Sequence, residues 1–240
     1  MMKKTYNFHA GHNPAHMPGC GASSILNESI EDRAVKNEAL RLMTLLGNTV
    51  YDCTVDNGTS QSDVLTKIVA KCNSHKVDYD IAFHLNSGRN DLSGDGKTGG
   101  VEIYIYSEDM RPLAERVCKE VAALGFTNRG VKVNKSLYVL KYTAAPAMLI
   151  ECCFVDDADD AKLYNAASMA RAIVKGLTGE VYTEPSIQAN DEAKKADAET
   201  ATGDPKKLYR VQVGAYSIKE NAERMKAKLH ELGIDAYIVG

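Results

Sequence analysis

The sequence predicts an α/β fold, with a twisted, largely parallel sheet flanked by helices and a small C-terminal βαβ unit. Strand-like apolar runs alternate with amphipathic segments of helical spacing over the first 180 residues. The composition then changes, and large apolar residues almost vanish before reappearing near residue 207. We therefore expect a main domain at 1–180, a linker at 181–206 and a C-terminal unit at 207–240.

The strands are predicted from short runs rich in apolar and β-branched residues. They are Thr5–Ala10, Thr49–Thr54, Asp80–Leu85, Val101–Tyr106 and Ala147–Phe154. The helices are predicted from apolar residues that recur every three or four positions. They are Glu28–Leu46, Asp63–Asn73, Met110–Leu124 and Asp159–Leu177. Gly47 and Gly125 mark the ends of the first and third helices.

Composition excludes several classes of protein. The net charge of -3 gives no sign of nucleic-acid binding, and no apolar run approaches the length of a membrane span. The residues after Lys3 and Lys4 lack the apolar core of a secretory leader, so we expect synthesis in the cytoplasm without a signal peptide. The six cysteines are scattered without a C-x-x-C pair, which argues against a disulfide framework.

Four chemically active residues follow or interrupt these elements. His12 follows the first strand, Glu28 begins the first predicted helix, and His84 and Glu151 lie near the ends of later strands. Ligands of such sheets bind beyond the carboxyl ends of the strands. Two imidazoles and a carboxylate are a ligand set of zinc hydrolases, and a second carboxylate supplies the base. If the four residues converge, the protein is a metal-dependent hydrolase.

Each candidate also has a structural interpretation. Glu28 has an alternative role as an acid favoured by the dipole at a helix N-terminus. Glu151 interrupts an apolar strand, where a carboxylate is costly unless it is paired, protonated or near a metal. We therefore weigh a functional Glu151 against a paired structural acid. His9 and His16 are expected to have packing or surface roles.

The segments around these four residues resemble a known family. They read Ala10-Gly11-His12-Asn13-Pro14, Leu26-Asn27-Glu28-Ser29, Ile81-Ala82-Phe83-His84-Leu85-Asn86 and Leu149-Ile150-Glu151-Cys152-Cys153-Phe154. Their order and spacing resemble the zinc-dependent N-acetylmuramoyl-L-alanine amidases of the amidase 3 class. One departure is Asn13, where many members carry a second glycine, and this puts the shape of the first loop in question.

The resemblance implies that His12, Glu28 and His84 bind Zn²⁺. It also implies that Glu151 accepts a proton from a zinc-activated water and delivers it to the leaving amine. The bond cut would join N-acetylmuramic acid to L-alanine in peptidoglycan. Two alternatives stay open: a zinc peptidase that acts on the stem peptide, and a catalytically inactive wall-binding protein.

A glycine-rich segment, residues 94–99, formally matches the dinucleotide-binding pattern G-x-G-x-x-G. It precedes a strand and opens no helix, so we interpret it as a flexible loop at the mouth of the site. Lys97 in this loop and Arg89 before it are candidate substrate-binding residues. Asn86 is either a turn residue or a third candidate substrate-binding residue.

The C-terminal unit resembles one half of a SPOR repeat, a module that binds peptidoglycan. The matching segments are Tyr209–Tyr216, Asn221-Ala222-Glu223, Leu229 and Gly233–Val239. A full SPOR domain has two βαβ halves, so this half either pairs with a second copy in a homodimer or is a degenerate remnant. The whole chain fits a phage endolysin, or an autolysin of a sporulating mother cell, that reaches the cell wall after lysis or release.

Overall fold

The computed structural model describes residues 3–183 and, nearer the C-terminus, 222–223, 225–226, 229–230 and 236–238. The chain divides into two units, Met1–Glu184 and Pro185–Gly240, and the fold below is that of the first. The predicted linker at 181–206 and the βαβ unit at 207–240 lie almost entirely outside the described residues, so both stay predictions. None of the described helices combines the length and apolarity that crossing a bilayer demands.

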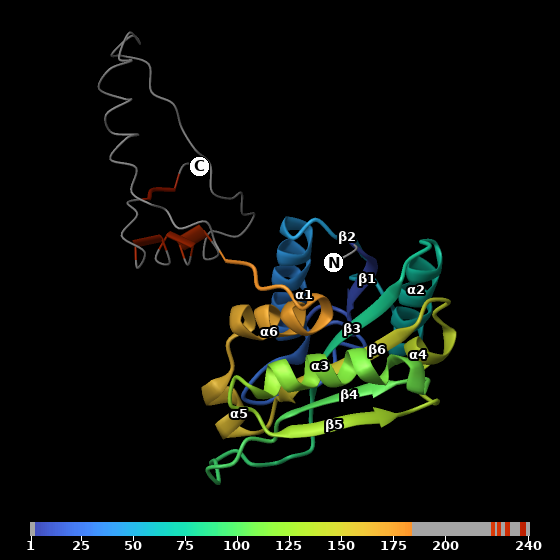
Figure 1. Cartoon of the computed structure of the whole chain (residues 1–240). Helices are drawn as coiled ribbons and strands as arrows, with labels where there is room; N and C mark the ends of the chain where they lie inside the picture. Colours follow the sequence, from blue (N-terminus) through green and yellow to red (C-terminus); the bar gives the residue numbers. More distant parts are fainter. Residues whose placement is uncertain (1–2, 184–221, 224, 227–228, 231–235, 239–240) are drawn as a thin grey trace, which may run out of the picture. The chain divides into compact units, whose positions relative to one another are not determined.

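A six-stranded sheet forms the centre of the first unit (Figure 1). Its strands are β1 (Thr5–Ala10), β2 (Thr49–Asp52), β3 (Tyr79–Asn86), β4 (Val101–Ile105), β5 (Asn128–Val133) and β6 (Ala147–Phe154). The spatial order is β2-β1-β3-β6-β4-β5, and every neighbouring pair is parallel except β4 with β6. This architecture confirms the predicted α/β fold with a largely parallel sheet.

Helices cover both faces of the sheet (Figure 1). They are α1 (Glu28–Leu45), α2 (Gln61–Asn73), the 3-10 turn η1 (Glu108–Met110), α3 (Arg111–Ala122), α4 (Tyr138–Tyr142), α5 (Ala158–Leu163) and α6 (Ala166–Thr178). Helices α1, α3 and α6 share one apolar cluster with a face of the sheet, and α2 and α4 share a smaller cluster with the other face. Successive side chains of β4 therefore point alternately into the two clusters. Ile103 lies in the large cluster, whereas Tyr104 packs against the small one.

The sequence did not predict β5 and α4. Strand β5 reads Asn-Arg-Gly-Val-Lys-Val, is largely exposed, and pairs only with β4 at the edge of the sheet. It therefore has no alternating apolar face to detect. Helix α4 has five residues, which is too short for a helical period to emerge.

The prediction of a single helix over Asp159–Leu177 is wrong. The chain forms α5 and α6, separated where Tyr164 adopts an extended conformation (φ −63°, ψ 132°). Asn165 then caps α6, because its side chain accepts a hydrogen bond from the backbone N–H of Ser168 (2.9 Å). The apolar spacing continues through the break, so periodicity alone did not reveal it.

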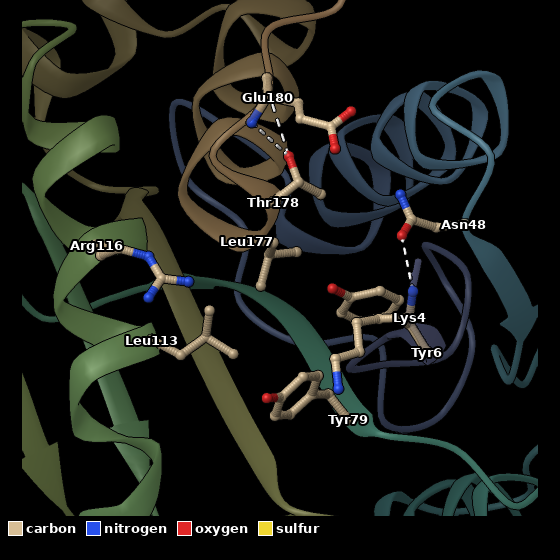
Figure 2. A pocket seen from close by; sticks show the side chains of 9 residues that line it. All are labelled: Lys4, Tyr6, Asn48, Tyr79, Leu113, Arg116, Leu177, Thr178 and Glu180. Atoms are coloured by element: carbon tan, nitrogen blue, oxygen red, sulfur yellow. Dashed lines mark hydrogen bonds between the residues drawn. The ribbon is translucent and has the colours of Figure 1, made fainter. Parts of the chain in front are cut away.

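A pocket of about 230 Å³ lies at the edge of the sheet where β1 and β3 begin (Figure 2). Tyr6 and Tyr79 form part of its wall, with their ring centroids 5.7 Å apart, and Arg116 reaches it from α3. Tyr6 is the second residue of β1 and Tyr79 the first of β3, whereas His84 lies near the carboxyl end of β3. The pocket is therefore at the opposite edge of the sheet from the candidate site.

We expect Gly176→Ala to destabilise the protein, although alanine is the better helix former by about 1 kcal/mol. A Cβ at Gly176 would lie 2.5 Å from the Cα of Val117, so α6 must move away from α3. Overpacking of this kind lowers the free energy of unfolding by about 1–3 kcal/mol. Urea denaturation measures the effect. The control is Arg171→Ala on the exposed side of α6, expected within about 0.5 kcal/mol of wild type. A more stable Gly176→Ala variant would refute the close contact.

Candidate metal centre

His12, Glu28 and His84 converge at the carboxyl edge of the sheet. His12 lies in the loop after β1, Glu28 is the first residue of α1, and His84 belongs to β3. The Oε1 atom of Glu28 is 3.1 Å from Nε2 of His12 and 3.1 Å from Nδ1 of His84. The two imidazole rings meet edge to face, with centroids 4.8 Å apart. One donor atom from each residue lies within 4.8 Å of the others, a spacing that a metal ion can bridge.

Two glycines make room for these side chains. A Cβ on Gly11 would lie 1.8 Å from Cε1 of His84. A Cβ on Gly21 would lie 2.5 Å from Oε2 of Glu28, and the φ of Gly21 is +75°. The packing of both ligands thus requires residues without side chains at these positions.

Backbone amides orient the Glu28 carboxylate. The N–H of Ala22 donates to Oε2 (2.9 Å), and the N–H of Leu85 donates to Oε1 (3.2 Å). Leu85 directly follows the candidate ligand His84, so one hydrogen bond ties α1 to the end of β3. Hydrogen bonds of this kind hold the side chains that bind a metal in the correct orientation.

Asn13 fixes the loop that carries His12. Its side chain is buried and bonds Gly58 twice: Nδ2 donates to the carbonyl (2.7 Å) and Oδ1 accepts from the N–H (3.0 Å). Nδ2 also donates to the carbonyl of Pro18 (2.6 Å). The loop therefore has a defined shape with asparagine here, which answers the question raised by this departure from the family pattern.

The protonation tendencies of His84 and Glu28 suit metal binding, whereas a metal ion at His12 must displace a proton. Burial lowers the pKa of His84, which favours the neutral imidazole. Burial raises the pKa of Glu28, but hydrogen bonds from His12 and His84 outweigh burial and bring it below the usual range. Burial likewise lowers the pKa of His12, but the nearby Glu28 carboxylate outweighs it and raises that pKa. Two imidazole nitrogens and an ionised carboxylate fit a zinc ion by donor chemistry.

Glu151 lies beside this cluster. On β6 it is in register with His84 of β3, and residues paired in this way project from the same face of the sheet. Among the described residues, no group forms a hydrogen bond with its buried Oε2 atom. Burial raises the pKa of Glu151 well above the usual value, and the charges of Glu28 and Glu102 add to this effect. An unpartnered carboxylate near three potential ligands is the feature expected of a general base.

The three candidate substrate-binding residues have different surroundings. Asn86 ends β3, and its Nδ2 donates to Oε1 of Glu102 (2.9 Å). Arg89 forms an ion pair with the buried Asp157 (3.0 Å), so it holds its own loop. Lys97 is exposed in the same loop. Their roles in substrate binding stay predictions.

His9 and His16 lie outside the cluster. His9 is buried within β1, where burial lowers its pKa to about 3, so it remains neutral. His16 is exposed in the loop that follows His12, at a φ of +70°. These positions agree with the packing and surface roles expected of the two residues.

A second group of carboxylates, Asp91, Asp157 and Asp159, also lies within metal-binding distance. Each of the three carboxylates already accepts hydrogen bonds. Asp91 accepts from two backbone amides of its own loop, Asp157 from the Arg89 side chain, and Asp159 from the backbone N–H of Gly96. These bonds explain the cluster as the anchor of the loop between β3 and β4.

The sequence reasoning missed a polar network centred on Glu102. This carboxylate accepts hydrogen bonds from the side chains of Asn86, Tyr104, Arg129 and Lys132. Glu102 lies directly opposite Glu151 across the β4–β6 pair. The sequence held a signal for Glu102, because this charged residue lies inside an apolar strand, as Glu151 does. It held no such signal for Arg129 and Lys132, since their strand β5 was not predicted.

Comparison with known proteins gives two family matches. The N-acetylmuramoyl-L-alanine amidase family matches residues 9–181, and the SPOR domain family matches residues 188–240. The second match begins inside the segment predicted as a linker.

Individual relatives are similar over most of the chain. N-acetylmuramoyl-L-alanine amidase CwlM of Bacillus licheniformis is 29% identical, over 92% of this chain and 82% of its own. The sporulation-specific N-acetylmuramoyl-L-alanine amidase of Bacillus subtilis is 28% identical, over 84% of this chain and 72% of its own. Among solved structures, the catalytic domain of the CD27L endolysin has a TM-score of 0.67 at 24% identity. That match covers 75% of this chain and 99% of the other, and it supports the fold.

We expect Gly11→Ala to weaken zinc binding by about 10–100-fold, because the new methyl group displaces the ring of His84. Competition with a chromophoric chelator measures the affinity. Gly96→Ala is the control: its φ of +81° strains the backbone of its own loop, but its Cβ would meet no atom within 4 Å and the residue lies outside the cluster. Both substitutions put alanine into a glycine position, but only the first should change metal affinity. Equal affinities in the two variants would show that His84 is not a ligand.

Proposed function

Because this chain belongs to the N-acetylmuramoyl-L-alanine amidase family, we propose that it hydrolyses the amide between the lactyl group of N-acetylmuramic acid and L-alanine in peptidoglycan. The observation that carries this proposal is the unpartnered Glu151 carboxylate in register with His84. The amidases among its relatives support the same bond.

His12, Glu28 and His84 would hold the zinc ion. When bound, zinc supplies a Lewis acid that polarises the scissile carbonyl and lowers the pKa of a nearby water toward about 7. The amides of Ala22 and Leu85 keep the Glu28 carboxylate oriented, so the three donors need little reorganisation on binding.

Glu151 would move the proton. Its carboxylate accepts a proton from the attacking water as the oxygen bonds to the lactyl carbonyl carbon. It then returns this proton to the alanine nitrogen as the C–N bond breaks, which leaves a free amine and a lactyl carboxylic acid that loses its remaining proton to solvent. A raised pKa helps Glu151 to hold the proton between the two steps.

The C-terminal unit would bring the enzyme to its substrate. The match to the SPOR family supports binding to the glycan strands of peptidoglycan. Pairing of this unit between two copies stays a prediction. We further propose that the protein acts at the bacterial cell wall as a lytic enzyme. The sporulation-specific relative favours a mother-cell autolysin over a phage endolysin.

We expect Glu151→Gln to lower the rate of amide cleavage by at least about 100-fold while the zinc content stays unchanged. Mass spectrometry of fragments from purified peptidoglycan identifies the bond: an amidase frees the amine of L-alanine, whereas a peptidase frees other amines. A chelator should abolish cleavage by the wild type, and added zinc should restore it. Glu115→Gln, on the exposed side of α3, is the matched control. A fully active Glu151→Gln variant would exclude Glu151 as the base.

The pH profile tests the same residue. Because Glu151 must be ionised to accept a proton, activity falls as the pH drops through its pKa, which burial places above the usual value. We expect the acid limb of kcat/KM at a pH above about 4.3, the ordinary value for glutamate. Zinc content measured at each pH separates this limb from loss of the metal. A limb at or below the ordinary value would contradict this expectation.

A further inference from the structure

Three acidic or metal-ligating side chains form a row across the sheet. His84 of β3 is paired with Glu151 of β6, and Glu151 is paired in turn with Glu102 of β4. Directly paired residues project from the same face, and neighbouring strands are about 4.8 Å apart. The row therefore leads from the metal ligands to the base and then, one strand further, to Glu102.

An irregularity in β5 brings two cations to the end of this row. Asn128 pairs with Val101 and Val131 pairs with Ile103, so Arg129 and Gly130 together oppose the single residue Glu102. Gly130 has a φ of +81°, which suits such a bulge. In a regular strand, residues three apart project from opposite faces. Here Arg129 and Lys132 both reach the same Oε2 atom of Glu102.

The charges at this point do not balance. One buried carboxylate, with 3% of the Glu102 side chain exposed, serves two cations, of which Arg129 is 35% exposed and Lys132 is 43% exposed. Burial raises the pKa of Glu102, but hydrogen bonds from Lys132, Tyr104 and Arg129 outweigh it and lower the pKa to about 2. Two cations thus share the single carboxylate of Glu102.

Arg129 is held in place with donors to spare. Its Nε donates to Glu102 (2.7 Å), and its guanidinium lies 5.0 Å from the centroid of the Phe154 ring. Within residues 3–183, its two terminal nitrogens have no hydrogen-bond acceptor. A guanidinium with free terminal N–H groups is suited to a carboxylate.

The direction of the reaction brings a peptide to these cations. The acyl oxygen of the scissile amide belongs near the metal ligands, and the leaving nitrogen belongs near Glu151, which protonates it. The leaving peptide therefore starts at β6, and the next strands on that side are β4 and β5. One residue of extended chain spans about 3.5 Å, so the second residue of the stem peptide reaches the neighbouring strand.

We propose that Arg129 and Lys132 form a subsite for a carboxylate of the stem peptide, on the residue that follows L-alanine. The proposal rests on the proposed amidase function and adds a specificity to it. The subsite distinguishes a free carboxylate from its carboxamide, because the amide cannot accept a charge-assisted pair of hydrogen bonds.

Two defined substrates test the proposal on the zinc-loaded full chain: N-acetylmuramoyl-L-alanyl-D-glutamate and N-acetylmuramoyl-L-alanyl-D-isoglutamine, each with its γ-carboxyl group blocked as a methylamide so that only the α-carboxylate or carboxamide differs. We expect kcat/KM to be about tenfold higher for the carboxylate, which corresponds to one charge-assisted hydrogen bond. Arg129→Gln and Lys132→Gln should each reduce the ratio of kcat/KM for the carboxylate to kcat/KM for the carboxamide toward one. Lys119→Gln removes an exposed cation of α3, on the other face of the sheet, and should keep the full preference.

Calorimetric titration of the product dipeptides, the γ-methylamides of L-alanyl-D-glutamate and L-alanyl-D-isoglutamine, gives a readout independent of turnover. Tighter binding of the carboxylate by the wild type, lost in Arg129→Gln, supports the subsite even where one variant folds poorly. If the wild type cleaves both substrates equally and binds both dipeptides equally, the subsite is refuted while the amidase function stands. If neither substrate is cleaved but the dipeptides are still distinguished, the proposed function fails and the subsite stands.

Discussion

The lateral register between β3 and β6 is the constraint on which the site depends. It pairs His84 with Glu151, and through the β4–β6 pair it aligns Glu102 with both. A slip of one residue would turn Glu151 toward the large apolar cluster and bring Ile150 to the site. The register is fixed because the residues on either side of Glu151, Ile150 and Cys152, are fully buried in that cluster. Packing on one face therefore secures chemistry on the other.

The two buried glutamates of this row show how surroundings decide charge. Burial raises the pKa of both. Glu102 has four side-chain donors and stays ionised, whereas Glu151 has an oxygen without any partner in residues 3–183 and is driven toward protonation. A carboxylate whose oxygens are hydrogen-bonded serves as fixed structure, and a carboxylate with an unbonded oxygen can exchange protons. Two identical side chains on adjacent strands thereby take different roles.

Much of the fold and of the candidate site could be predicted from the sequence, for a physical reason. His84 and Glu151 interrupt apolar strands, and a polar group in such a place needs an explanation. Every strand except β5, and the overall fold, followed from the same alternation. The rest depended on features without a local signal: the exposed edge strand β5 and the bulge at Gly130, which lets two cations on one strand share a face. The break between α5 and α6 at Tyr164 also has no local sequence signal, since the apolar spacing continues across it.

The reversed direction of β4 has an architectural consequence. In a wholly parallel sheet, only the segments that follow strands can gather at the functional edge. Here the segment that precedes β4 arrives there as well, and carboxylates after β6 tether it: Asp156 accepts from three successive loop amides, and Asp160 accepts from Gly100. The segment between β3 and β4 thus borders the active face without contributing to the core. A change in its length or composition would therefore alter the border of the site while the packing of the sheet stays intact.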